Sequence, residues 1–219
     1  MAIRIGIFGG TFNPIHYGHL RAAEEVRERL NFDKILFIPS GNPPFKTKEL
    51  VDKTHRYKMV ELSIAANQFF EISDIECRLT GRSYTVKTLE ELRRINPEAE
   101  ISFMLGIDAF LDIPNWWHPE RLSGLTDFVI ISRPGLRFTD LQASPYIKIN
   151  RKTLKDLDNT VFEKYMLKLK NNRNVTLLRL TPIGISSTEI RILINQGKSI
   201  KYLLPAEVES YIIANKLYI

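Results

Sequence analysis

The sequence predicts an α/β protein built on a Rossmann-like, doubly wound parallel sheet with a small C-terminal helical portion. Short apolar runs alternate with amphipathic segments along the 219 residues, which is typical of parallel strands joined by crossover helices. A glycine-rich segment, GGTFNPIHYGHL at residues 9–20, follows the first apolar run. No linker, repeat or low-complexity segment interrupts this order. We therefore expect one domain over residues 1–219, with residues 182–219 as its helical end.

Composition and charge limit the function classes. The chain is 44% hydrophobic and 26% charged, which is ordinary for a globular protein. No run reaches the roughly 18 apolar residues that span a bilayer, so we expect no membrane partner. The lone Cys77 is in keeping with a cytoplasmic protein. The net charge of +6 suits a nucleic-acid binder and equally a pocket for anionic nucleotides, and much of the excess lies in residues 148–173, which also fits a solvated surface.

The first half of the chain predicts three strands and three helices. Apolar runs indicate the strands, and helical spacing of apolar residues indicates the helices. The strands are expected over residues 3–8, 34–39 and 69–75 and the helices over residues 19–30, 54–66 and 83–95. Thr54 and Ser83 are candidate N-caps of the second and third helices. The prolines of SGNPPFK, after the second strand, predict a stiff loop that ends at Lys46.

The second half continues the alternation less regularly. The strands are expected over residues 101–105, 126–132 and 175–180 and the helices over residues 161–169, from residue 186 onward and over residues 205–216. The two tryptophans and neighbouring prolines around residue 116 predict a loop. Residues 137–174 show no clear pattern. The helix over 161–169 rests on Phe162, Tyr165, Met166 and Leu169, which would share one helical face.

The glycine-rich turn indicates an anion site. Gly9 and Gly10 lack a Cβ, so they can take positive φ and let another group approach the main chain closely. Gly18 opens the next helix, whose unpaired N–H groups and positive dipole end favour phosphate. His16 and His19 are three residues apart and can both donate to phosphate oxygens. A zinc site would need further ligands that the turn does not offer, and an incidental turn is the remaining alternative.

Later segments offer further binding groups. TGRSYT at residues 80–85 leaves N–H groups free at a helix start beside Tyr84 and Thr85, with an ordinary helix cap as the alternative. The adjacent Trp116 and Trp117 suit a stacking platform, a core plug, or one ring in each role. Arg133 follows a strand at the end where ligands bind in open α/β sheets, and a surface arginine is its alternative.

ISSTEIR at residues 185–191 predicts a second phosphate-binding helix start. Ser186 and Glu189 fit a capping box, which accounts for both residues structurally. Ser187, Thr188 and Arg191 are then left over for phosphate.

Known nucleotide-binding fingerprints limit the enzyme classes to which the chain can belong. G-x-G-x-x-G is absent after the first strand and G-x-x-x-x-G-K-S/T is absent from the chain, so neither a dehydrogenase nor a P-loop enzyme fits. GGTFNPIHYGHL and ISSTEIR resemble instead the signatures of the nucleotidyltransferase superfamily. With PSGNPPFK, the HR pair at 55 and 56, GRSYTVKTL, LGIDAF, SRPG and QGKSIKYLLPAEVESYI, the motifs cover nearly the whole chain. Together they resemble the bacterial nicotinate-mononucleotide adenylyltransferases in particular.

The resemblance implies a role for each matching residue. The residues implied in catalysis are His16, His19 and Arg191. Those implied in ATP binding are Gly9, Gly10, Thr11, Phe12, Gly18, Gly106, Asp108, Arg133, Ile185, Ser187 and Thr188. The carboxylate of Asp108 would accept from ribose hydroxyls. Those implied in binding the second substrate are Asn13, Lys46, Tyr84, Thr85 and Trp116, of which Lys46 is equally well a plain surface lysine.

The implied reaction is attack by the 5′-phosphate of nicotinate mononucleotide on the α-phosphorus of ATP, giving deamido-NAD and pyrophosphate. A phosphate monoester with a second pKa of about 6 is mostly dianionic at neutral pH and needs no general base. Charge neutralisation is expected from the histidines, arginine and a Mg²⁺ delivered with ATP, without a metal site made of protein groups alone.

The sequence leaves rivals open. The nearest are adenylyltransferases acting on nicotinamide mononucleotide or phosphopantetheine. A basic nucleic-acid-binding protein that uses residues 148–173 is the rival of a different class, although we expect no nucleic-acid partner. The oligomeric state is undetermined, and a homodimer is among the states allowed.

Overall fold

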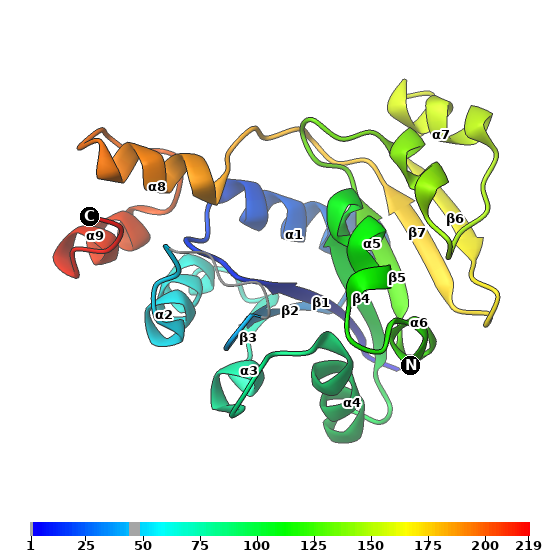
Figure 1. Ribbon diagram of the computed structural model, residues 1–219, viewed down its shortest axis with the longest axis horizontal. Helices are drawn as coiled ribbons and strands as arrows, with labels where there is room; N and C mark the ends of the chain where they lie inside the picture. Colours follow the sequence, from blue (N-terminus) through cyan, green and yellow to red (C-terminus); the bar gives the residue numbers. More distant parts are fainter. Residues whose placement is uncertain (1, 44–48) are drawn as a thin grey trace.

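A computed structural model describes residues 2–43 and 49–219 and forms a seven-stranded sheet between two layers of helices (Figure 1). The strands are β1 (Arg4–Gly10), β2 (Lys34–Pro39), β3 (Phe70–Ile72), β4 (Glu100–Gly106), β5 (Asp127–Ile131), β6 (Lys164–Lys168) and β7 (Asn174–Leu178). Their order is β3-β2-β1-β4-β5-β7-β6, and all neighbours are parallel except β6, which pairs antiparallel with β7. The predicted α/β class with a doubly wound parallel sheet is confirmed.

Helices cover both faces of the sheet because successive strand residues point to opposite faces and both sets are apolar. The helices are α1 (Tyr17–Leu30), α2 (Lys53–Ile64), α3 (Ile75–Arg78), α4 (Thr85–Ile95), α5 (Ile107–Asp112), α6 (Pro119–Leu125), α7 (Arg151–Asp158), α8 (Ser187–Asn195) and α9 (Ala206–Ala214), with short 3-10 turns η1 (Ile113–Asn115) and η2 (Phe138–Ala143). On β5, Phe128 and Ile130 join the core beneath α4, α5, α6 and α7. Val129 and Ile131 join the opposite core beneath α1, α2, α8 and α9.

The topology opens a crevice beside β1. The chain passes from β1 outward to β2 and β3, then returns to the other side of β1 as β4. At such a switch point the connections leave in opposite directions, and ligands bind outside the carboxyl ends of the strands. Because β1 ends at Gly10 and β4 ends at Gly106, the glycine-rich turn and the start of α5 meet at this edge.

The last two helices lie at one end of the molecule, beside α1 and α2, while β6 and α7 lie at the other end (Figure 1). The contact between α2 and α9 includes a hydrogen bond of 2.9 Å between His55 Nδ1 and the Tyr211 hydroxyl. The C-terminal residues thereby return to the edge of the sheet that carries the crevice.

Two predicted elements are wrong. Residues 161–169 do not form a helix, since β6 occupies 164–168 with alternating burial and Met166 is 60% exposed. The pairing with β7 decides the conformation there, and the helix of this region is α7 instead. The strand predicted over 69–75 is only β3, because Ile75 already begins α3.

Smaller corrections concern caps and the tryptophan segment. Asp52, not Thr54, caps α2, because the Asp52 carboxylate accepts from the Thr54 N–H at 2.8 Å. The segment around Trp116 is not one loop, since α5, η1 and α6 divide it into short helical turns. Strand β2, by contrast, has the bounds predicted for it.

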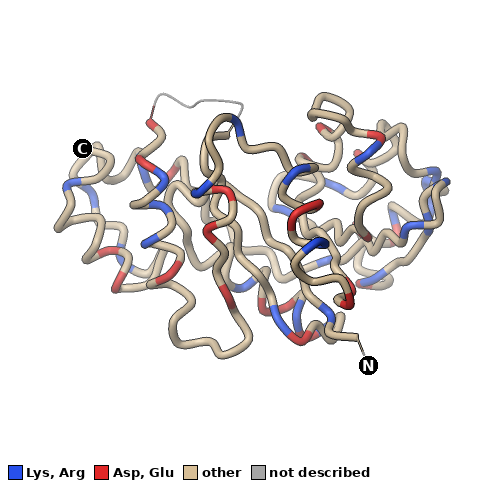
Figure 2. Tube along the Cα trace, turned by 90° about the horizontal axis from the view of Figure 1, so that it is seen from below, with Lys and Arg blue, Asp and Glu red and all other residues tan. Residues whose placement is uncertain are grey.

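Charged residues are spread over the molecule. Lys and Arg occur along the whole trace, with Asp and Glu among them (Figure 2). The basic stretch 148–173 contributes α7 and β6, at the end of the sheet away from α8 and α9. Among residues 2–43 and 49–219, no helix has the length and apolar character needed to cross a membrane.

Candidate active site

A cavity of about 1310 Å³ opens at the carboxyl ends of β1 and β4. It brings together most residues singled out in the sequence: Gly9, Gly10, Thr11, Phe12, Asn13, His16, Gly18, His19, Tyr84, Thr85, Gly106, Trp116, Arg133, Ile185, Ser187, Thr188 and Arg191. Asp108 is not part of the lining but pairs with Arg133, which is. Lys46 lies outside the described residues.

Close packing explains the glycines of the turn. Neither Gly9 nor Gly10 has a positive φ, and the residue in the left-handed region is Phe12, with a φ of 48°. A Cβ on Gly10 would lie 3.1 Å from the Phe12 ring, and one on Gly18 would lie 3.0 Å from the His16 ring. The expectation of positive φ at Gly9 and Gly10 is therefore wrong, whereas the close approach that a missing Cβ allows is confirmed.

His16 and His19 form a stacked pair at the start of α1. Their ring centroids lie 3.8 Å apart, with 27° between the planes. His16 is the N-cap residue of α1, and its side chain makes no capping hydrogen bond. The Nδ1 atoms of both rings are buried without a hydrogen-bond partner among the described residues. Because an unpaired buried polar atom costs free energy, a ligand that satisfied these atoms would bind here with a gain.

Both imidazoles are neutral at pH 7 in the free protein. Burial, assisted by the nearby Arg133, lowers the pKa of His16 to about 4. Burial also holds the pKa of His19 well below its usual value, assisted by His16 and Arg133. In the free protein the two histidines therefore offer hydrogen bonds and not charge. A neutral ring still donates one N–H to an oxyanion.

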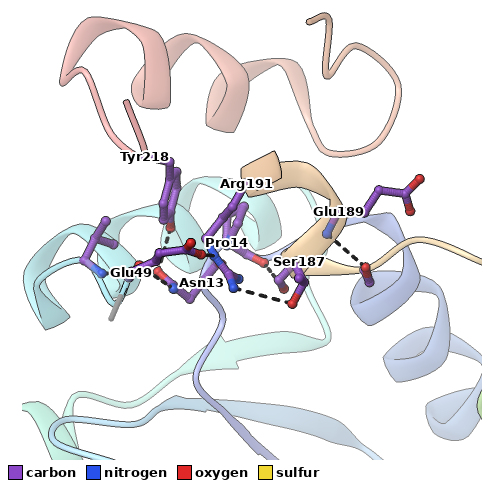
Figure 3. A network of polar contacts seen from close by, with 10 residues as sticks. Asn13, Pro14, Glu49, Ser187, Glu189, Arg191 and Tyr218 are labelled. Carbon is purple, nitrogen blue, oxygen red and sulfur yellow. Dashed lines mark hydrogen bonds and ion pairs between the residues drawn. The ribbon is translucent and has the colours of Figure 1, made fainter. Parts of the chain in front are cut away.

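Asn13 holds the turn in shape with both polar atoms of its side chain and with its main-chain carbonyl (Figure 3). Its Nδ2 donates to the Glu49 carbonyl at 3.0 Å, and its Oδ1 accepts from the Tyr218 hydroxyl at 2.9 Å and the Val51 N–H at 3.4 Å. Its own carbonyl accepts from Arg191 Nη1 at 2.9 Å. The turn after β1 is thus tied to α8 and to the penultimate residue of the chain.

The start of α8 is also tied to this turn. Ser186 caps the helix, since its hydroxyl accepts from the Glu189 N–H at 3.1 Å, as the sequence predicts. The Ser187 hydroxyl donates to the Pro14 carbonyl at 2.7 Å (Figure 3). The hydroxyls of Ser186 and Ser187 therefore already have protein partners.

Arg191 reaches from α8 across the same turn. Its Nε lies 2.9 Å from Glu49 Oε2, and its Nη2 donates to the Thr188 hydroxyl at 3.4 Å. The Arg191 side chain is only 11% exposed, whereas that of Glu49 is 67% exposed. An anion in the cavity could replace the Glu49 carboxylate without displacing the Asn13 contact, because the guanidinium has five N–H donors.

The start of α4 forms another wall. Tyr84 is its N-cap residue, and no side chain caps the helix. Ser83, predicted as the cap, instead accepts from the Asn42 N–H at 2.9 Å with its hydroxyl. The prediction is wrong because the Ser83 hydroxyl bonds the loop after β2, and within residues 2–43 and 49–219 no side chain caps the start of α4.

The adjacent tryptophans divide the two roles considered for them. Trp116 is half-buried, packs on Phe103, and donates from Nε1 to Asp112 Oδ2 at 3.0 Å. Trp117 is 39% exposed and stacks on Tyr84, with ring centroids 4.8 Å apart and 27° between the planes. Lys87 Nζ lies 5.2 Å from the centroid of the Trp117 ring. Trp117 also lines the cavity but was not among the residues implied in substrate binding, because two adjacent identical residues give no local sign of which ring faces the site.

Asp108 and Arg133 form an ion pair over the end of β4. Arg133 Nη1 lies 2.7 Å from Asp108 Oδ2, and both side chains are about half exposed. Gly106 lies directly beneath, because a Cβ there would come within 2.5 Å of Asp108 Oδ1. The pair places one carboxylate and one guanidinium at the mouth of the crevice.

Comparison with known proteins shows the family. A family model described as cytidylyltransferase-like matches residues 7–192. The probable nicotinate-nucleotide adenylyltransferase of Geotalea daltonii is 44% identical over 99% of this chain and 98% of its own length. A protein of the same name from Syntrophotalea carbinolica is 43% identical over 99% of this chain and 97% of its own. The chain belongs to the nicotinate-nucleotide adenylyltransferase family.

A solved structure agrees on the fold. The nicotinic acid mononucleotide adenylyltransferase of Plasmodium falciparum, complexed with NaAD, has a TM-score of 0.73 at 23% identity and covers 99% of this chain and 97% of its own. The resemblance drawn from GGTFNPIHYGHL, ISSTEIR and the other motifs is thus confirmed at the level of the family.

Proposed function

We propose that this protein transfers the adenylyl group of ATP to nicotinate mononucleotide, forming deamido-NAD and pyrophosphate in NAD biosynthesis. The observation that carries the proposal is the single cavity shared by two unlike walls. On one wall, at the start of α1, the buried Nδ1 atoms of His16 and His19 have no partner among the residues that the structure describes. The other holds a second uncapped helix start beside stacked aromatic rings. Membership of the family supports the same reaction.

The wall formed by the β1–α1 turn suits the triphosphate. His16 and His19 each offer a neutral ring N–H, and the start of α1 adds backbone N–H groups and its dipole. Arg191 adds a charge from the opposite side of the turn. Asp108 is the proposed acceptor for ribose hydroxyls, once its ion pair with Arg133 opens. These groups would hold ATP with its α-phosphorus toward the middle of the cavity.

The wall formed by the start of α4 suits the pyridine mononucleotide. The exposed face of Trp117 and the ring of Tyr84 provide apolar surface for a flat heterocycle. The uncapped N–H groups of α4 favour a carboxylate, and Lys87 adds positive charge over the same rings. This pairing of an aromatic surface with an anion-binding helix start supports the acid over the amide.

The chemistry needs no protein nucleophile. An oxygen of the acceptor 5′-phosphate forms a bond to the α-phosphorus of ATP, and the bond from that phosphorus to the bridging oxygen of the pyrophosphate breaks. The phosphate is mostly dianionic at neutral pH because its second pKa is about 6. The protein's part is to align the two substrates and to donate hydrogen bonds where charge builds up in the transition state.

Mg²⁺ is expected to enter with ATP. In the part of the chain that the structure describes, no three His, Cys, Asp or Glu side chains converge where they could hold a metal ion. An ion coordinated by triphosphate oxygens and water fits this donor set, because Mg²⁺ readily keeps several water ligands. Once bound, it neutralises charge on the triphosphate. The residues near it would be His19 and Arg191, which add donors and not ligands.

Pyrophosphate release with a panel of acceptors tests the proposal. The purified protein is given ATP, Mg²⁺ and one of nicotinate mononucleotide, nicotinamide mononucleotide or phosphopantetheine. We expect the highest kcat/KM with nicotinate mononucleotide and deamido-NAD as the product. A higher kcat/KM with nicotinamide mononucleotide would refute the acid preference. Release with none of the three, together with salt-sensitive RNA binding, would refute the enzyme assignment.

A further inference from the structure

Arg56 of α2 is a buried cation whose hydrogen bonds within the described residues all go to main-chain carbonyls. It is 1% exposed and is among the largest fully buried side chains. Its guanidinium donates to the Thr11 carbonyl at 2.8 Å, the Gly41 carbonyl at 3.1 Å and the Val51 carbonyl at 3.1 Å. Within the described residues no carboxylate lies within 4.0 Å of it. Thr11 belongs to the wall that we assign to ATP.

Burying an arginine without a counter-ion costs free energy, so Arg56 must contribute something through the geometry of its hydrogen bonds. Burial lowers the pKa of Arg56, because the charged guanidinium is less stable in the protein interior than in water. An apolar side chain of similar volume often serves stability as well as a buried ion. An arginine offers something an apolar residue cannot, a planar fork that fixes three acceptors in one plane. The three acceptors here come from three separate segments of the chain.

One of these segments, Ser40–Asn42, connects the two walls of the cavity. The Ser40 N–H donates to the Gly10 carbonyl at 2.9 Å, which attaches the segment to the turn after β1. At its other end the Asn42 N–H donates to the Ser83 hydroxyl, and the Ser83 N–H donates back to the Asn42 carbonyl, both at 2.9 Å. Ser83 immediately precedes Tyr84, the N-cap residue of α4. We call Ser40–Asn42 the bridge, and Arg56 donates to its middle residue at the Gly41 carbonyl.

The far side of Gly41 is closed as well. A Cβ on Gly41 would come within 2.0 Å of the Glu76 carbonyl, so no side chain fits between the bridge and α3. The Glu76 carboxylate is buried and accepts from the Thr88 hydroxyl of α4 at 2.8 Å. The bridge is therefore held between Arg56 and the chain at Glu76, and it has little room to shift.

We propose that Arg56 is a positioning residue that fixes the separation of the two walls through the bridge Ser40–Asn42. The inference rests on the proposed function, in which one wall holds ATP and the other the acceptor. In-line attack requires the acceptor oxygen to approach the α-phosphorus within a narrow range, and a displacement of about 1 Å can cost about 100-fold in rate. Arg56 thus sets the alignment of two substrates, neither of which it touches.

The test compares Arg56→Lys with Arg4→Lys. Arg4 also donates to two main-chain carbonyls, those of Leu30 and Asn31, but lies at the opposite end of β1. A lysine ammonium cannot reach three carbonyls in one plane. For each variant the thermal midpoint, the Kd for ATP alone and the kcat for pyrophosphate release are measured. We expect Arg56→Lys to lower kcat about 100-fold while the Kd for ATP stays within about threefold, and Arg4→Lys to leave both near wild type.

The outcomes separate the claims. A folded Arg56→Lys protein with wild-type kcat would overturn the positioning role and leave the proposed function standing. An equal loss of kcat in Arg4→Lys would also overturn it, because the effect would then be general destabilisation. If Arg56→Lys does not fold, Ser83→Ala loosens the same bridge, and a kcat unchanged from wild type would overturn the role. A wild-type protein without adenylyl transfer would overturn the proposed function and this inference together.

Discussion

The turn after β1 and the start of α8 were both predicted to bind phosphate, yet the structure gives them opposite states. At the turn, the Nδ1 atoms of His16 and His19 are buried without a hydrogen-bond partner in residues 2–43 and 49–219, and the His16 side chain does not cap α1. At α8, Ser186 caps the helix and Arg191 already bonds Asn13 and Glu49. The first region can bind a ligand without breaking a contact described here, whereas the second must exchange a protein partner for the ligand.

From this difference we infer that the two regions have different roles in binding and catalysis. A donor that is preorganised and unpartnered loses little on binding, so the turn should provide most of the transition-state stabilisation. A group that gives up a protein carboxylate for a phosphate gains only the difference between the two interactions. The start of α8 should therefore contribute mainly by holding the turn in shape.

Replacing His19 is the strongest way to break this comparison. We expect His19→Ala to lower kcat about 100- to 1,000-fold, because loss of one preorganised donor typically has that effect. The measurement is steady-state pyrophosphate release, with thermal unfolding to check the fold. His55→Ala is the matched control, since His55 bonds Tyr211 away from the cavity. An unchanged kcat in His19→Ala would remove this residue from the site.

The burial of His16 at the turn should also make the free energy of unfolding depend on pH. His16 has a pKa of about 4 in the fold against 6.5 unfolded, so below pH 6.5 the unfolded chain binds the extra proton and stability falls as pH falls. The shift corresponds to about 3 kcal/mol, lost between pH 6.5 and 4. Urea unfolding of wild type and His16→Gln across this range measures it. A wild-type loss no greater than that of His16→Gln would contradict the assignment.

Glu49→Gln tests whether Arg191 exchanges partners. The substitution weakens the ion pair at 2.9 Å and frees the guanidinium for phosphate. We expect the KM for ATP to fall about twofold to fivefold, since an exposed pair of this kind contributes up to about 1 kcal/mol. Kinetics at low and high salt provide the check, because the gain should shrink with ionic strength. A raised KM for ATP would indicate that Glu49 itself contacts the substrate.

The smallest effect is expected at Tyr218. Its hydroxyl donates to Asn13 Oδ1 at 2.9 Å, so Tyr218→Phe removes one bond that holds the turn. We expect a loss of about 1 kcal/mol in the free energy of unfolding and a decrease of a few-fold in kcat/KM. Urea unfolding and initial rates measure the two quantities. Wild-type values for both would show that the C-terminal tail does not support the turn.

Local patterns were enough to predict the framework. The apolar run at 34–39 predicted β2 with its observed bounds, and the Ser186–Glu189 spacing predicted the cap of α8. Both succeed because the deciding interactions lie within a few residues. The family motifs predicted most of the cavity lining because each motif lies within one turn or helix start.

Interactions between distant segments account for the failures. Residues 161–169 have apolar spacing that fits a helix, but pairing with β7 makes them a strand. Ser83 is a suitable cap by type, yet its hydroxyl accepts instead from the N–H of Asn42, 41 positions away. The bond between Asn13 and Tyr218 joins residues 205 positions apart and leaves no local trace. The neutral state of the histidines likewise depends on burial that only the folded chain creates.

The central claim is that the cavity aligns ATP and the acceptor for direct transfer, without an adenylylated protein group. Exchange of labelled pyrophosphate into ATP tests it most directly. We expect exchange only when nicotinate mononucleotide is present, because pyrophosphate leaves only as the acceptor attacks. Exchange with protein, Mg²⁺ and ATP alone would contradict the account, since it would require the protein itself to accept the adenylyl group.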